Sequence, residues 1–149
     1  MSQCASHELE RIELWKQRSG LDFLGAVRSR KVVACMIDNV SDGAAVVFVD
    51  FLGRTTAFPA GLFAIAAKCD APVLPVHVNW HAKTDRFRVV FGPAVLTDST
   101  ETLDVRTAVG AQAVANYFSE VVGRNPGDWE SWRTLEYRWP TEPAHRGAT

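Results

Sequence analysis

Hydrophobic and polar residues follow two different periods along this chain, and the periods predict where helices and strands lie. Apolar residues at helical spacing predict a short helix over residues 21–30 and a long helix over about 104–123. Two apolar runs, 31–38 and 45–51, have the length and β-branched composition of strands. Because such runs are typical of strands covered on both faces, they favour a parallel sheet.

Glycine and proline punctuate the middle of the chain. Gly53 predicts a turn, and Pro59 is acceptable in the first turn of a helix predicted over about 57–68. Residues 71–80 predict a further strand, with 86–92 as its hairpin partner. The order helix, strand, strand, helix, strand, strand, helix predicts an α/β fold with a mixed, largely parallel sheet flanked by helices.

The length of the chain limits how these elements are organised. A chain of 149 residues is long enough for one domain with a real core. Polar composition predicts a loose segment over residues 1–20 and a disordered tail over 140–149. We therefore expect a single α/β domain over residues 21–139.

Charge and cysteine content narrow the function. The formal net charge is −1, and the basic residues are scattered, so nucleic acid is not an expected partner. The three cysteines are odd in number and lack CxxC spacing, which favours a reducing compartment. No group of His, Cys and acidic residues recurs at metal spacing, and no dinucleotide or Walker fingerprint is present. We expect no metal and no cofactor.

Candidate binding residues stand where predicted strands end. Asp38 closes the run 31–38, and Gly53 and Arg54 follow Phe51. Ligands of α/β proteins bind beyond the carboxyl ends of strands, and a following helix start offers free N–H groups to a phosphate or oxyanion. The alternative is that Gly53 is only a turn, Arg54 a solvated charge and Asp38 a cap of the next turn.

Other reactive side chains have simpler explanations. His81 and Asp85 lie in a predicted hairpin loop, so we expect solvated residues; an unrelated α/β enzyme using this pair is a further hypothesis. His77 alternates within a strand, and a Cys69–His77 dyad is disfavoured because Cys69 lies on an apolar helix stripe.

The C-terminal end is rich in aromatic residues. It contains Trp129, Trp132, Tyr137 and Trp139, together with Arg133 and Arg138. These side chains either rim a membrane-binding surface or pack a C-terminal segment against the core, and packing is the plainer hypothesis.

Four short motifs occur in a characteristic order. They are Asp38-Asn39 at a strand end, Phe51-Leu52-Gly53, Pro59-x-Gly61 at a helix start, and the Ala-Pro-Val-Leu-Pro-Val run 71–76. Their order and spacing resemble the C-terminal half of the bacterial lipid A biosynthesis acyltransferases, which belong to the lysophospholipid-acyltransferase-like superfamily. The resemblance extends over about residues 21–139, which would then form part of an acyltransferase-like domain.

The resemblance implies a function and a location. Such enzymes transfer a fatty acyl group from acyl carrier protein or acyl-CoA to a hydroxyl of a glycolipid or lysophospholipid. The implied location is the cytoplasmic face of the bacterial inner membrane as a peripheral protein, or the cytoplasm if the chain is truncated. The substrate-binding residues that the resemblance implies are Asp38, Phe51, Gly53, Arg54, Pro59 and Gly61.

The catalytic pair of that family is a histidine followed, after four residues, by Asp or Glu; the histidine is the general base and the carboxylate orients it. The positions five residues after His7, His77 and His81 are Ile12, Ala82 and Arg86, and His145 has none. No catalytic residue is therefore expected in this chain, which is interpreted as truncated. The alternative is a non-catalytic module that binds a lipid headgroup or acyl carrier protein and needs a partner chain.

Overall fold

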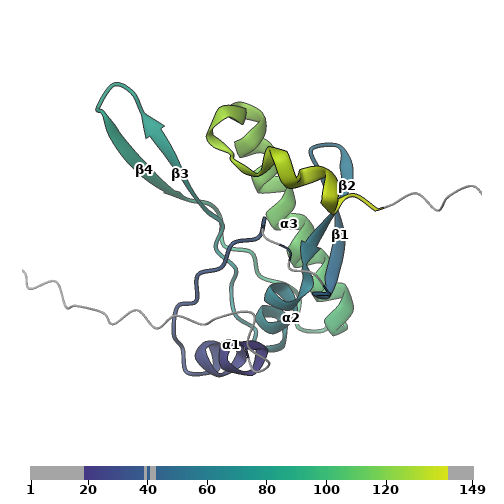
Figure 1. Ribbon diagram of the computed structural model, residues 1–149. Helices are drawn as coiled ribbons and strands as arrows, with labels where there is room; N and C mark the ends of the chain where they lie inside the picture. Colours follow the sequence, from purple (N-terminus) through teal and green to yellow (C-terminus); the bar gives the residue numbers. More distant parts are fainter. Residues whose placement is uncertain (1–18, 39, 41–42, 141–149) are drawn as a thin grey trace, which may run out of the picture. The chain divides into compact units, whose positions relative to one another are not determined.

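The structure of the chain is a computed structural model, drawn as a ribbon in Figure 1. It describes residues 19–38, 40 and 43–140. The predicted loose segment and C-terminal tail lie outside the described residues, apart from Ser19, Gly20 and Pro140. The chain divides into two compact units, Met1–Val33 and Ala34–Thr149, and each is described by itself.

The first unit contains α1, Ser19–Arg28, which confirms the helix predicted over 21–30 with a shift of two residues. The helix ends in a left-handed turn, because Arg30 has a φ of 57°. The N–H of Arg30 donates to the carbonyl oxygen of Val27 and that of Lys31 to Ala26. This is the Schellman arrangement, in which glycine usually takes the position of Arg30.

The second unit opens with an antiparallel hairpin of β1, Val46–Phe51, and β2, Arg54–Pro59. Leu52 and Gly53 form the turn with φ values of 54° and 77°. Two successive left-handed residues make a type I′ turn, whose twist matches that of the strands it joins. The predicted strand and the predicted glycine turn are therefore confirmed.

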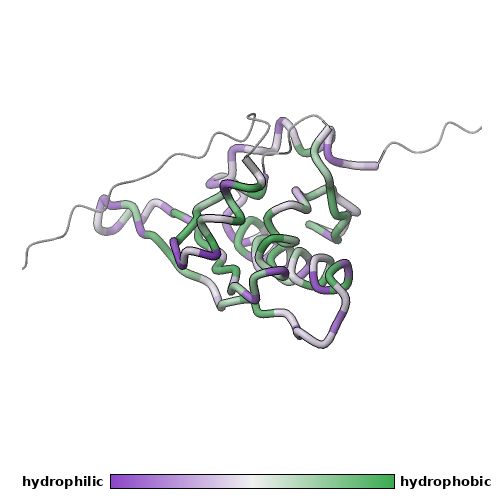
Figure 2. The backbone as a smooth tube through the Cα atoms, turned by 90° about the horizontal axis from the view of Figure 1, so that it is seen from below, coloured by the Kyte–Doolittle hydropathy of each residue, from purple (hydrophilic) through white to green (hydrophobic). Residues whose placement is uncertain are grey.

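Helices α2 and α3 pack on this hairpin. α2, Ala60–Lys68, begins three residues later than predicted, because residues 57–59 belong to β2. α3, Leu103–Arg124, confirms the long helix, and the Thr102 side chain accepts a hydrogen bond from the Val105 N–H at its start. In Figure 2 the helical turns of the tube carry both hydrophobic and hydrophilic residues, as expected of helices with one buried face.

The core of the second unit lies between the hairpin, α2 and the buried face of α3. Small residues on α3 bring it close to its neighbours, and large residues on the other elements fill the space. The buried core cluster consists of Val49, Phe51, Phe58, Phe63, Ala111, Val114, Ala115, Val122 and Leu135.

A second hairpin follows α2. β3, Val76–His81, pairs antiparallel with β4, Arg86–Phe91, which confirms the predicted hairpin. An isolated antiparallel bridge between Val73 and Val95 ties its base together. The two hairpins form separate two-stranded sheets.

The α/β class is thus confirmed, but the described residues contain only antiparallel strand pairs. The strand expected over 31–38 is not formed; this run has no regular secondary structure, and Val32 is 99% exposed. Tight turns allow β1–β2 and β3–β4 to pair locally, whereas a parallel pair needs a crossover and a partner strand. The expected order of helices and strands recurs with different strands: the run 31–38 is not a strand, the run 45–51 forms β1, and β2 was not predicted.

The chain continues after α3 as two 3₁₀ helices, η1, Pro126–Asp128, and η2, Ser131–Arg138. Leu135 and Arg138 of η2 are buried. Packing of the C-terminal segment against the core, the plainer of the two hypotheses, is therefore confirmed. Among the described residues, no helix has the length and apolar character needed to cross a membrane.

Candidate functional site

The six residues expected to bind substrate lie in three places, because β2 separates residues that the sequence had placed together. Phe51 is paired with Arg54 at the turn end of the first hairpin, whereas Pro59 is paired with Val46 at its open end. Five residue steps along a strand span about 17 Å. The expectation that the Gly53 turn leads directly into a helix start is therefore wrong.

The N-terminus of α2 holds Pro59 and Gly61. Pro59 precedes the helix with φ −65° and ψ 115°, and no side chain caps this end among the described residues. The Ala60 N–H donates to the Ala45 carbonyl oxygen at 2.9 Å. Gly61 is exposed, and a Cβ there would meet open space. This end of α2 carries a partial positive charge from the helix dipole.

Asp38 binds the C-terminal segment that follows α3. Its Oδ2 accepts hydrogen bonds from the Ser131 hydroxyl at 2.7 Å and the Trp129 indole N–H at 3.2 Å. A carboxylate with two donors holds these side chains in one geometry. Asp38 therefore orders the segment that follows α3.

Arg138 is the residue that sequence reasoning undervalued. It is 6% exposed, and its Nε donates to the Ala57 carbonyl oxygen at 2.9 Å, with Nη2 donating to the Ile37 carbonyl oxygen at 3.4 Å. Burial lowers the pKa of its guanidinium, and the charge of Asp38 opposes that shift. Its cation also lies 4.7 Å from the ring centre of Phe58.

Two more of the expected residues contact this segment. Phe51 is buried, and its ring packs on Phe58 and edge-on against Trp129, with centroids 5.5 and 5.4 Å away. Arg54 is exposed, and its guanidinium carbon lies 3.6 Å from the ring centre of Trp139. We call the set Asp38, Phe51, Arg54, Trp129, Ser131, Arg138 and Trp139 the C-terminal clamp.

The structure thus brings Asp38, Phe51 and Arg54 to one C-terminal segment and leaves Pro59 and Gly61 at the other end of β2. The sequence signal for the clamp was the density of Trp, Tyr and Arg near the C-terminus. The sequence did not indicate which of these side chains would be buried, because exposed Tyr137 and buried Arg138 are neighbours in the chain.

The histidines of the described part of the chain make local contacts. His77 Nδ1 lies 3.1 Å from the Tyr117 hydroxyl, and His81 Nδ1 lies 2.9 Å from the Thr84 hydroxyl. Asp85 is exposed in the turn of the second hairpin. Among the described residues, neither His77 nor His81 has an acidic partner of the kind that a general base requires.

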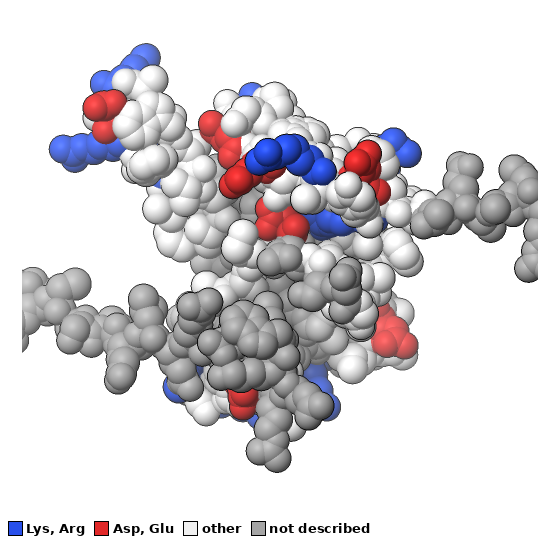
Figure 3. All heavy atoms as spheres, viewed as in Figure 1, with Lys and Arg blue, Asp and Glu red and all other residues white. Residues whose placement is uncertain are grey.

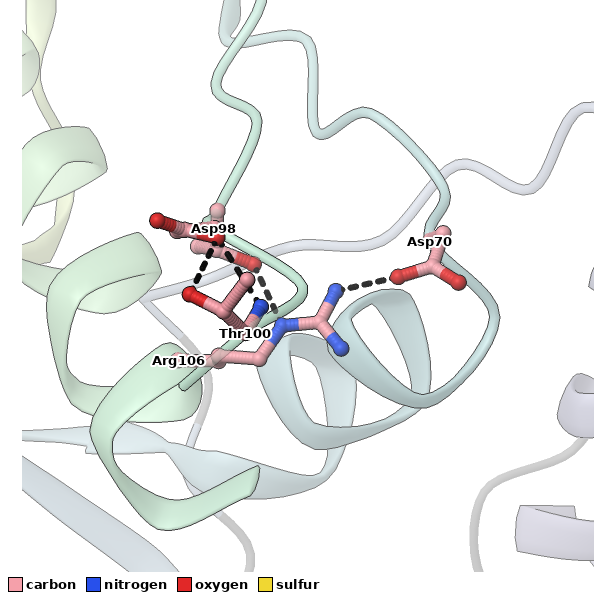
Figure 4. Close-up of polar contacts among 5 residues, drawn as sticks. Asp70, Asp98, Thr100 and Arg106 are labelled. Carbon is pink, nitrogen blue, oxygen red and sulfur yellow. Dashed lines mark hydrogen bonds and ion pairs between the residues drawn. The ribbon is translucent and has the colours of Figure 1, made fainter. Parts of the chain in front are cut away.

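A polar cluster at the start of α3 has a structural role. Arg106 forms an ion pair with Asp70 and donates to the Thr97 hydroxyl at 3.1 Å (Figure 4). Asp98 accepts from both the N–H and the hydroxyl of Thr100, and these bonds lower its carboxyl pKa. The cluster fastens the end of α2 to the start of α3, since Asp70 lies two residues after the last residue of α2.

The fold and the clamp define a mixed α/β protein whose strand-end residues are held by an aromatic C-terminal segment. A sequence profile of the family described as bacterial lipid A biosynthesis acyltransferase matches residues 11–141. Because the match covers well over half of the chain, the protein belongs to the bacterial lipid A biosynthesis acyltransferase family. No curated protein matches the chain in a sequence search.

Proposed function

We propose that this chain is the substrate-binding part of an acyltransferase that moves a fatty acyl group from acyl carrier protein or acyl-CoA to a hydroxyl of a lipid A-type glycolipid. The observation that carries this proposal is the family match over residues 11–141. Membership supports an acyltransferase-like function, with an acyl donor and a lipid acceptor as general substrate classes.

In this proposal the start of α2 receives the charged oxygen of a substrate. Gly61 leaves room for an oxygen to approach the N–H groups that follow that of Ala60, and the helix dipole stabilises negative charge on a thioester oxygen or a phosphate. Arg54 is exposed at the far end of β2 and suits a second anionic group of a long substrate. Asp38 and Phe51 act by positioning, since they support the C-terminal segment.

In our proposal, the general base that deprotonates the acceptor hydroxyl comes from residues outside this sequence. Two observations support this: no histidine of the sequence is followed five positions later by Asp or Glu, and the described histidines bond to hydroxyls. A companion polypeptide region would also give residues 31–38 the neighbouring strands of a largely parallel sheet, covering the exposed Val32 and Met36. In this proposal the active assembly works at the cytoplasmic face of the inner membrane, where a lipid acceptor would be held.

A binding and turnover assay tests this function. The chain is incubated with labelled acyl-acyl carrier protein or acyl-CoA and a lipid A-type disaccharide with a free hydroxyl. We expect saturable donor binding without transfer, and transfer once the half of a family member that carries the His-x4-Asp/Glu pair is added. Turnover by the chain alone that is lost in His77→Ala or His81→Ala would show that the base lies in this chain.

A matched pair of glycine variants tests the α2 site. Gly61 and Gly123 both lie in helices and have open space where a Cβ would be placed. Gly61→Leu is expected to weaken donor or acceptor binding about tenfold by blocking the helix start, whereas Gly123→Leu leaves binding unchanged. Equal binding by both variants would remove α2 from the substrate site. The intact mass of the native polypeptide measures whether further residues are joined to this sequence in the cell.

A further inference from the structure

The second hairpin has one face made only of apolar side chains. Three facing pairs of its register lie on that face: Val76 with Phe91, Val78 with Val89, and Trp80 with Phe87. These six residues are each between 41% and 74% exposed. We call them the apolar hairpin face. Monomeric proteins rarely expose contiguous apolar patches, and such patches mark contact surfaces.

The other face of the hairpin is turned toward α3. His77 lies on that face, with its ring Nδ1 3.1 Å from the Tyr117 hydroxyl of α3 and the two rings 5.9 Å apart. Its partner Val90 is half-buried on the same face. Because side chains alternate along a strand, the apolar hairpin face points away from the second unit's own helix.

Basic side chains surround the tip of the hairpin. Lys83 lies in the turn, and Arg86 and Arg88 follow it on the strand face opposite the apolar hairpin face, paired with His81 and Asn79. Asp85 is the one acidic residue beside them, and all four charged residues are exposed. Figure 3 shows blue Lys and Arg atoms at this projecting tip. The tip of this hairpin is therefore positively charged, which attracts an anionic surface and repels the same hairpin of a second copy.

An aromatic pair adjoins the charged tip. The rings of Trp80 and Phe87 meet edge to face, with centroids 5.0 Å apart. Aromatic rings beside lysine and arginine are the combination that proteins place at the boundary between lipid headgroups and acyl chains. Anionic lipids attract the basic groups while the rings leave water.

We propose that the apolar hairpin face, with its basic tip, docks on the surface of an anionic lipid bilayer. The inference deepens the proposed function, since it names the surface that would bring the chain to a membrane-held acceptor. It does not depend on acyl transfer, because docking is measured without any acyl donor. Failure of one proposal is thus distinguishable from failure of the other.

Vesicle flotation of the full chain tests the docking. The probes are vesicles of phosphatidylcholine with phosphatidylglycerol, and vesicles of phosphatidylcholine alone. We expect binding to the anionic vesicles that weakens as salt is added, and much weaker binding to the neutral ones. A folded monomer that binds neither kind of vesicle would overturn the proposal.

Matched variants identify the face. Phe87 is 74% exposed and Tyr137, outside the hairpin, is 79% exposed, so both tolerate serine. Phe87→Ser is expected to weaken vesicle binding about tenfold or more, and Tyr137→Ser to leave it unchanged. Equal losses would mean that the hairpin is not the docking surface.

Charge reversal and light scattering complete the test. Lys83→Glu, in the turn of the hairpin, is expected to weaken binding to anionic vesicles about tenfold, whereas Lys68→Glu, the same change at another exposed position, has a smaller effect. A dimer in solution that Phe87→Ser dissociates would assign the face to a second copy and overturn membrane docking.

Discussion

The two hairpins of the second unit have strands of equal length and similar apolar content. The first buries most of the apolar side chains on one of its faces, whereas the second leaves those on its apolar face exposed. In the first hairpin, Val49, Phe51 and Phe58 are buried beneath the helices and the C-terminal segment. In the second, the apolar hairpin face is exposed along its whole length. Other elements of this chain bury the apolar face of the first hairpin. The apolar hairpin face of the second is exposed and is available for contact with another surface.

The backbone shows the same contrast. Side chains of α3 bond to the first hairpin: Gln112 both accepts from the N–H of Asp50 and donates to its carbonyl oxygen, and Ser119 accepts from the Leu52 N–H. Among the described residues, the bond between the second hairpin and α3 joins two side chains, His77 and Tyr117, and leaves the hairpin backbone out. The first hairpin is thus held as part of the core, and the second mainly by its own pairing.

The two hairpins are expected to differ most in stability when one phenylalanine is removed from each. Phe58 is 1% exposed, so Phe58→Ala leaves a cavity and is expected to lower the free energy of unfolding by about 3–5 kcal/mol. Phe87→Ala on the exposed face is expected to cost less than about 1 kcal/mol. Urea titrations of both variants measure the difference, and equal costs would mean that the apolar hairpin face is covered in solution.

Removing the charge of Asp38 tests how the first hairpin is covered. Asp38→Asn weakens the bonds from Trp129 and Ser131 and leaves Arg138 without its nearby anion. We expect a loss of about 2 kcal/mol in the free energy of unfolding, with a change in tryptophan fluorescence. Asp128→Asn, at an exposed site before the same segment, is the control and is expected to be nearly neutral.

The two turns are expected to respond in opposite directions to exchange of glycine. Gly53 has a φ of 77°, so Gly53→Ala is strained and is expected to destabilise the first hairpin by about 1 kcal/mol. Asp85 has a φ of 53° without being glycine, so Asp85→Gly is expected to stabilise the second hairpin by a similar amount. Amide hydrogen exchange of the strands measures both. Protection lost in Asp85→Gly would contradict the left-handed turn.

The smallest effect on stability is expected for a change of Asp98, which lies just before α3, the helix on which the first hairpin packs. Hydrogen bonds from Thr100, with Arg106 nearby, lower the pKa of Asp98 below its usual value near 3.9. Because the pKa of Asp98 is lower in the folded state, the ionised carboxylate stabilises the folded protein at pH values above the pKa of the unfolded state. This stabilisation is lost as the pH falls through the pKa of the folded state. Asp98→Asn should therefore flatten the dependence of stability on pH below about 4. Parallel curves for both proteins would contradict this.

Local patterns were sufficient to predict most of the elements. Periodicity placed α3 and the second hairpin, and Gly53 placed the turn of the first. The segment from Arg54 to Pro59 was mistaken in part for a helix start, because its strand character depends on pairing with β1 across the turn. Burial of Arg138 was equally hidden, since its partners Ile37 and Ala57 are remote in sequence.

The expected strand over 31–38 failed for a related reason. Its apolar composition favours a buried strand, but a strand forms only where a neighbour supplies hydrogen bonds. A sequence pattern indicates which secondary structure a segment favours, but not whether a neighbouring strand is present. Among the described residues, no strand pairs with residues 31–38. The candidate site was divided in the same way, because the presence of β2 moved Arg54 away from Gly61.

The bonds of Arg138 to Ala57 and Ile37 join residues separated by 81 and 101 positions. On a ribosome the chain emerges N-terminus first at about 5–20 residues per second. The first hairpin and its glycine turn are therefore exposed for seconds before the guanidinium that covers Phe58 has been synthesised. The core around the first hairpin is thus completed by a segment that is synthesised well after the hairpin itself.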